Sequence, residues 1–170
     1  MPIPRLGPAG RAMAIGLAFA APATALLLGC GESDEERYGD ALTAIARPLQ
    51  AELIDLGNAI GSANTRKQVS AALGRADEAL RSATGGLERL DPPAAGAEAQ
   101  ADLLAAIDDF EVRIARTRAV LRDGSDREVG RAMQAFNAAS QSFAATLGEI
   151  GRRLEDAGIP LGEPATSGTP

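Results

Sequence analysis

SDREVGRAMQAFNAASQSFAATLGEIGRRL, residues 125–154, is the stretch that decides the fold. Within it, apolar side chains and one serine recur every three or four residues, which places them on one face of an α-helix. Ser125 or Asp126 stands where a helix is expected to begin, and Gly158-Ile159-Pro160 has the order typical of a helix end. We therefore expect a helix between Ser125 and Gly158. Its apolar stripe is Val129, Met133, Phe136, Ser140, Phe143, Leu147, Ile150 and Leu154.

The same spacing appears in three earlier stretches of the chain. The first stretch ends at residues 61–64 and contains Pro48, so a kink or a break is expected near Ala46–Arg47. Ser33 and Glu36 have the spacing of a capping box at its start. Its stripe is Tyr38, Leu42, Ile45, Leu49, Leu53, Leu56 and Ile60.

The two middle stretches are bounded by clear start and stop signals. Thr65 with Gln68 three residues later predicts the cap of the second helix, and Asp91-Pro92-Pro93 stops it. The third helix is expected from about residues 94–97 to Asp123-Gly124. The second stripe is Val69, Leu73, Ala76, Leu80, Ala83, Leu87 and Leu90; the third is Leu103, Ile107, Phe110, Ile114, Thr117 and Leu121.

Four long helices joined by short connections predict an all-α fold, an antiparallel up-down-up-down four-helix bundle over residues 38–158. Aromatic residues make up only 3% of the chain, so its core must be built from Leu, Ile, Val and Ala, which suits closely packed helices. Residues 159–170 are expected to form a disordered tail, because they are short, polar and rich in Gly and Pro.

The charge and the residue inventory exclude several functions. All 23 acidic residues follow Cys30, whereas Arg5 and Arg11 are the 2 of the 17 basic residues that precede it, so the part from Cys30 onward carries −8. Such an acidic chain disfavours nucleic-acid binding. With one Cys and no His, the chain has no internal disulfide, no Cys/His zinc site and no His-based catalytic triad. No metal or cofactor is expected.

The N-terminus has the pattern of a secretory signal. Arg5 and Arg11 precede an uncharged, largely apolar run that ends at Cys30, the only cysteine. The last residues, Leu27-Leu28-Gly29-Cys30, resemble the lipobox of bacterial lipoproteins. The resemblance implies that residues 1–29 are a signal peptide, that cleavage falls between Gly29 and Cys30, and that Cys30 carries lipid. The protein would then be anchored on the extracytoplasmic face of the cell membrane.

Two points near the anchor have alternative interpretations. The apolar run could instead remain as an uncleaved transmembrane anchor, since a span needs about 20 residues. Residues 30–37 are assigned to a lipid-anchored tether, although the acidic run within them also suits the first turn of a helix. Beyond the lipobox, Leu90-Asp91-Pro92-Pro93 and the Ala-rich composition resemble the small helical lipoproteins of high-GC bacteria, a likeness that transfers no site residue.

Two charged groups are candidate sites. Arg113, Arg116, Arg118 and Arg122 could contact an anion or an acidic partner, because Arg binds carboxylates and phosphates bidentately. Charges that flank an apolar stripe are also ordinary in bundles. Asp108, Asp109 and Glu111 form the densest acidic cluster, which is more simply interpreted as a solvated helix face.

The sequence therefore favours a non-catalytic, lipid-anchored envelope protein that serves as a helical interaction or spacer module, with an envelope protein as its partner. The alternative is a lipoprotein that holds a small apolar or anionic molecule between its helices. Thr117 and Ser140 could line such a cavity, or their hydroxyls could bond the backbone carbonyl one turn back. An enzyme is the least favoured class.

Overall fold

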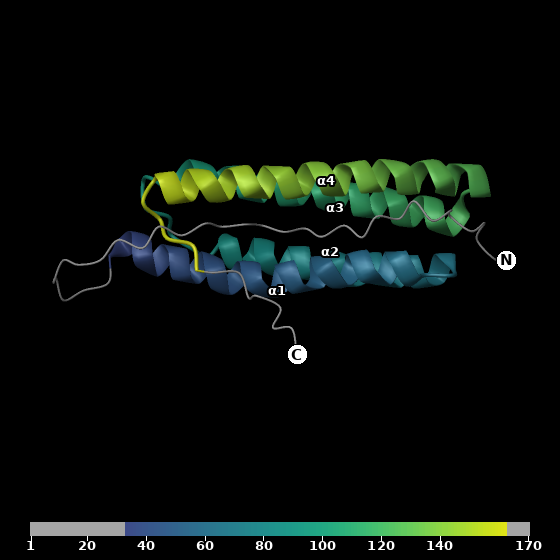
Figure 1. The fold of residues 1–170 in the computed structure, drawn as a ribbon, viewed down its shortest axis with the longest axis horizontal. Helices are drawn as coiled ribbons and strands as arrows, with labels where there is room; N and C mark the ends of the chain where they lie inside the picture. Colours follow the sequence, from purple (N-terminus) through teal and green to yellow (C-terminus); the bar gives the residue numbers. More distant parts are fainter. Residues whose placement is uncertain (1–32, 163–170) are drawn as a thin grey trace.

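The computed structural model describes residues 33–162, and this part of the chain contains four α-helices and no β-strand (Figure 1). The predicted all-helical class is confirmed. The expected signal peptide, the cleavage at Gly29 and the lipid on Cys30 lie outside the described residues. The helices are α1 (Asp34–Ser62), α2 (Arg66–Leu87), α3 (Ala97–Asp123) and α4 (Asp126–Asp156).

Three of the helices begin with a complete capping box, as the sequence predicts for α1 and α2. The Ser33 hydroxyl accepts a hydrogen bond from the backbone of Glu36, whose carboxylate accepts one from the backbone of Ser33. Thr65 and Ser125 cap α2 and α4 in the same way. Residues 34–37, assigned to the tether, therefore form the first turn of α1.

Pro48 does not break α1. The helix runs continuously from Asp34 to Ser62 with Pro48 inside it, so the predicted break is wrong. Pro48 lies on the exposed side of the helix, whereas Leu42 before it and Leu49 and Leu56 after it are buried. The packing of both halves of α1 outweighs the loss of one backbone hydrogen bond.

The helices pack in chain order. α1 packs on α2, α2 on α3 and α3 on α4, whereas every Cα atom of α1 lies more than 8 Å from every one in α4 (Figure 1). Helices that pack directly have axes 8–10 Å apart. The described domain is thus two tight helix pairs joined chiefly through α2 and α3.

The core is built from the predicted apolar stripes. Its large, fully buried side chains include Leu73, Leu80, Ile107 and Ile114 from α2 and α3. Three phenylalanines stack between α3 and α4: the ring centroid of Phe110 lies 4.5 Å from that of Phe143 and 5.7 Å from that of Phe136. These stacked rings supply large apolar area from a chain that has few aromatic residues.

Residues 157–162 cross from the end of α4 to α1, which corrects the prediction that the tail begins at residue 159. Ile159 is 0% exposed, and the backbone N–H of Gly162 donates to the Thr43 hydroxyl over 3.0 Å. Gly158 adopts the left-handed conformation that ends the helix, with φ of 79°. The prediction failed because two apolar side chains, Ile159 and Leu161, among Gly and Pro give no helical periodicity.

A buried hydrogen-bond chain joins three helices at the same end of the domain. The Tyr38 hydroxyl donates to the side-chain oxygen of Gln100 over 2.7 Å. The amide of Gln100 then donates to the backbone carbonyl of Leu87 over 3.0 Å. Each polar group is satisfied, so the chain fixes the relative positions of α1, α2 and α3 without the cost of an unpaired buried group.

Candidate functional site

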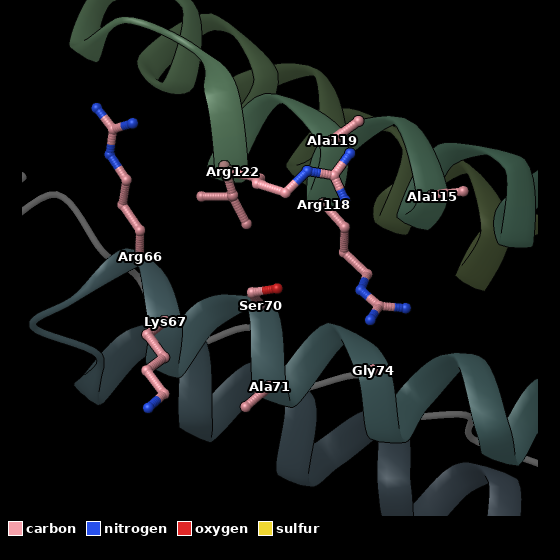
Figure 2. A pocket seen from close by; sticks show the side chains of 10 residues that line it. Arg66, Lys67, Ser70, Ala71, Gly74, Ala115, Arg118, Ala119 and Arg122 are labelled. Atoms are coloured by element: carbon pink, nitrogen blue, oxygen red, sulfur yellow. The ribbon is translucent and has the colours of Figure 1, made fainter.

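A groove of about 730 Å³ lies between α2 and α3, near the start of α2 and the end of α3 (Figure 2). Its lining combines four cationic side chains, one hydroxyl and five small or apolar residues, and it includes no carboxylate. The cations are Arg66 and Lys67 from α2 and Arg118 and Arg122 from α3. The groove therefore gathers four cations on an acidic protein, and carboxylates just outside its lining pair with three of them.

The floor of the groove is made of small residues. Ala71 and Gly74 come from α2, and Ala115 and Ala119 come from α3. Short side chains at facing positions leave the backbones of both helices open to close approach by a ligand. Arg118 extends across this floor toward Gly74 in Figure 2, and a Cβ atom at Gly74 would lie 3.6 Å from its guanidinium.

The four cations are held to different degrees. Arg66 donates to the carbonyl of Gly124 over 2.6 Å and forms an ion pair with Asp126. Arg122 pairs with its neighbour Asp123 over 2.9 Å, and both side chains are largely exposed. No carboxylate of the described residues lies within ion-pair distance of Lys67.

Arg118 is anchored to a buried carboxylate beside the groove. Asp77 of α2 is only 6% exposed, and its Oδ2 lies 3.5 Å from Nη1 of Arg118 and 2.8 Å from Nη2 of Arg81. Two guanidinium groups thus compensate one buried charge. This contact favours a position of the Arg118 guanidinium beside the groove floor, although the Arg118 side chain is still 41% exposed.

The structure divides the four predicted arginines into two pairs. Arg118 and Arg122 line the groove, whereas Arg113 pairs with Asp109 over 3.5 Å on the other flank of α3 and Arg116 is exposed outside the groove.

Two groove cations, Arg66 and Lys67, were not predicted from the sequence, although a signal was present. Both lie in the first turn of α2, which has no acidic residue. Cations at this position oppose the helix dipole, which favours negative charge at a helix N-terminus. Their unfavourable position is a reason to look for a second role.

The chain matches no protein-family model, no curated protein and no solved structure. The site must therefore be interpreted from its own chemistry. None of the described helices has a stretch long and apolar enough to cross a bilayer. Within residues 33–162, no three Asp or Glu side chains are grouped in a way that could hold a metal ion.

The predicted acidic cluster does not act as one unit. Asp108 and Asp109 are exposed, whereas Glu111 turns toward α2 and its Oε1 is buried without a hydrogen-bond partner among the described residues. Burial raises the pKa of Glu111, and the nearby charge of Asp77 raises this pKa further. The charged form of Glu111 thus destabilises the α2–α3 interface.

The two predicted polar stripe residues bond their own helices. The Thr117 hydroxyl donates to the carbonyl of Arg113 over 2.9 Å, and the Ser140 hydroxyl donates to the carbonyl of Phe136 over 3.0 Å. Both bonds reach one turn back, which is the usual way a helix satisfies a half-buried hydroxyl. Neither residue lines the groove.

Proposed function

We propose that this protein is a non-catalytic, lipid-anchored protein of the cell envelope whose helical bundle acts as an interaction module. The observation that carries the proposal is the groove between α2 and α3, which gathers four cations over a floor of small residues. Cations and small apolar residues suit recognition of an anionic partner. They offer no group that would act as a nucleophile or general base at neutral pH.

In the sequence the proposed anchor precedes α1, whereas the groove lies near the other end of that helix. Ser33 caps α1 three residues after Cys30, the proposed lipidation site. α1 has 29 residues, so its far end is about 40 Å from that cap at 1.5 Å per residue. Arg66 follows this far end and bonds the α3–α4 connection. A lipid on Cys30 would therefore leave the groove on the part of the bundle farthest along α1 from the membrane.

The finer topology that we propose is an antiparallel up-down-up-down bundle. Three residues separate α1 from α2 and two separate α3 from α4. Connections this short favour antiparallel neighbours. Such a rod would serve as a spacer as well as a presenting surface, since its connections at the far end are short and its core is continuous.

A second candidate function is the binding of a small anionic molecule, and the groove volume favours it. About 730 Å³ falls in the range of small-molecule sites. Thr117 and Ser140, in contrast, give no support to a ligand cavity inside the bundle, because both hydroxyls bond helix carbonyls.

Metabolic labelling tests the anchor directly. Cells that express the native chain or a Cys30→Ser variant are grown with radiolabelled palmitate, and the purified products are compared by autoradiography and by intact mass. Label on the native chain alone, with the mass of a chain that starts at Cys30 and carries lipid, is the expected result. An unlabelled cytosolic product that retains residues 1–29 would contradict the proposal.

A further inference from the structure

We propose that the α2–α3 groove binds an acidic helix of a partner protein, with carboxylates spaced three or four residues apart along one face. This inference rests on the proposed function, because it names the partner chemistry of the same interaction module. It follows from three features of the groove: its shape, the placement of its cations and the restraint on Arg118.

The shape favours a segment of polypeptide. The groove lies open along two helices, whereas sites for small molecules usually enclose most of their ligand. Ala71, Gly74, Ala115 and Ala119 line the groove, so the side chain that a third helix would have to displace from its floor is that of Arg118. Helices reach short interaxial distances where the interface residues are small.

The placement of the cations matches an acidic helix. Arg118 and Arg122 are four residues apart on α3, so their side chains are offset by about one helical turn, near 6 Å along the axis. Carboxylates at the same spacing on a parallel or antiparallel helix would face both arginines. Lys67 and Arg66 belong to the opposite wall; Figure 2 shows the Lys67 side chain directed away from α3, and Arg66 is held by Gly124 and Asp126, so a bound helix would have to draw both toward it.

The negative net charge of the protein affects where an acidic partner could bind. The chain from Cys30 onward carries −8, so most of its surface repels an acidic helix. The lining of the groove, in contrast, contains four cations and no carboxylate. An acidic partner would therefore be steered to this place and discouraged elsewhere.

The existing ion pairs leave Arg122 available. Arg122 pairs with Asp123 at the surface, where both side chains are more than two-thirds exposed. Surface pairs contribute little and exchange partners easily. Arg118 is different, because buried Asp77 holds it in place. Its guanidinium is pre-positioned, which lowers the ordering cost of binding.

The test uses the full-length protein in detergent and a short, capped, alanine-based helical peptide with glutamates four residues apart. Fluorescence anisotropy of the labelled peptide is measured at low salt. The native protein is expected to bind it and not to bind a matched peptide with glutamine in place of glutamate. Failure to bind the glutamate peptide would overturn the proposal.

Two double variants separate the groove from general charge. Lys67→Gln with Arg122→Gln removes two groove cations and is expected to weaken binding by about fourfold or more, since each exposed pair contributes about two- to fivefold. Arg113→Gln with Arg116→Gln removes the same charge from the other flank of α3 and is expected to change affinity less than about twofold. Equal losses in both variants would overturn the proposal.

A third variant tests the floor. Ala119→Glu places a carboxylate in the groove and is expected to abolish binding, whereas Ala105→Glu, on an exposed site of α3 outside the groove, should have little effect. Unchanged binding by Ala119→Glu, or displacement of the peptide by equimolar inorganic phosphate or by anionic lipid vesicles, would overturn the acidic-helix proposal.

The anchor proposal and the acidic-helix proposal are tested by separate measurements, so either can fail while the other stands. A Cys30→Ser protein is expected to bind the glutamate peptide as well as the native chain does. Absence of palmitate on Cys30 would thus leave the peptide result standing, and absence of peptide binding would leave the palmitate result standing.

Discussion

Glu111 shows how one side chain can tie stability to pH. Burial, and then repulsion from Asp77, raise its pKa above that of an exposed glutamate, while Arg81 opposes the shift. Between the ordinary and the raised pKa, the folded chain holds a proton that the unfolded chain has lost. The stability from Glu111 is therefore present at acidic pH and is lost as the pH rises through the raised pKa.

Replacing Glu111 with a neutral residue should remove this loss of stability at rising pH. Glu111→Gln is expected to stabilise the protein near pH 7, by less than about 1 kcal/mol, and to have a smaller effect at acidic pH, where Glu111 carries less charge. Urea denaturation across this pH range measures the change. Glu78→Gln, an exposed change on α2, serves as the control. A native-like pH profile for Glu111→Gln would contradict the assignment.

For individual residues, the sequence identifies the charged side chains but does not show which other helix they lie against. Arg118 and Arg122 were predicted as part of one patch with Arg113 and Arg116, and helical spacing does place the two pairs on different flanks. Which flank meets α2 depends on how the helices pack. The burial of Asp77 depends on the same packing, so it carried no signal in the sequence.

Among the helices, two glycines should respond to the same substitution in opposite ways. A Cβ atom on Gly39 of α1 would lie 2.1 Å from the carbonyl oxygen of Pro160, whereas one on Gly148 of α4 meets nothing within 4 Å. Gly39→Ala is expected to cost about 2 kcal/mol, because the segment 157–162 must move. Gly148→Ala is expected to stabilise by about 1 kcal/mol through helix propensity.

Thermal and urea denaturation of both variants check this pair. Hydrogen exchange at the backbone N–H of Gly162 should also accelerate in Gly39→Ala, since its bond to Thr43 depends on the same close packing. Equal effects of the two substitutions on stability would mean that the segment does not pack tightly on α1.

Helix starts were predicted well where a capping box marks them, whereas α2 ends at Leu87, before the predicted stop at Asp91. Ser33, Thr65 and Ser125 each cap a helix with a partner three residues later, and this spacing is visible in the sequence alone. A break at Pro48 was wrongly expected because the local penalty of proline was weighed without the tertiary packing on either side. Propensity is a weak guide wherever packing on both sides of a residue holds the helix.

At the scale of the whole molecule, Ile159 lies in a segment that connects two helices that do not pack directly on each other. α1 and α4 do not pack directly on each other, and the segment that carries Ile159 crosses between them. Ile159 is fully buried beside Tyr38 and Gly96. Ile159→Ala is expected to destabilise the protein by about 2–4 kcal/mol, because it removes buried methyl groups and leaves a cavity.

Urea denaturation measures this effect, and Ile54→Ala provides the matched control because Ile54 is 42% exposed on α1. The control should change stability by less than about 1 kcal/mol. If both substitutions cost the same, residues 157–162 would not belong to the cooperative unit, and the predicted boundary at residue 158 would stand.

Ser33 begins α1, and Gly162 returns to Thr43 on the same helix, so the described chain starts and finishes toward one side of the rod. A handle fused after residue 162 would therefore immobilise the molecule on a biosensor chip by the side on which α1 begins, with the groove turned to the flowing analyte. The connection at residues 63–65, at the opposite pole, is the place to avoid for such a fusion.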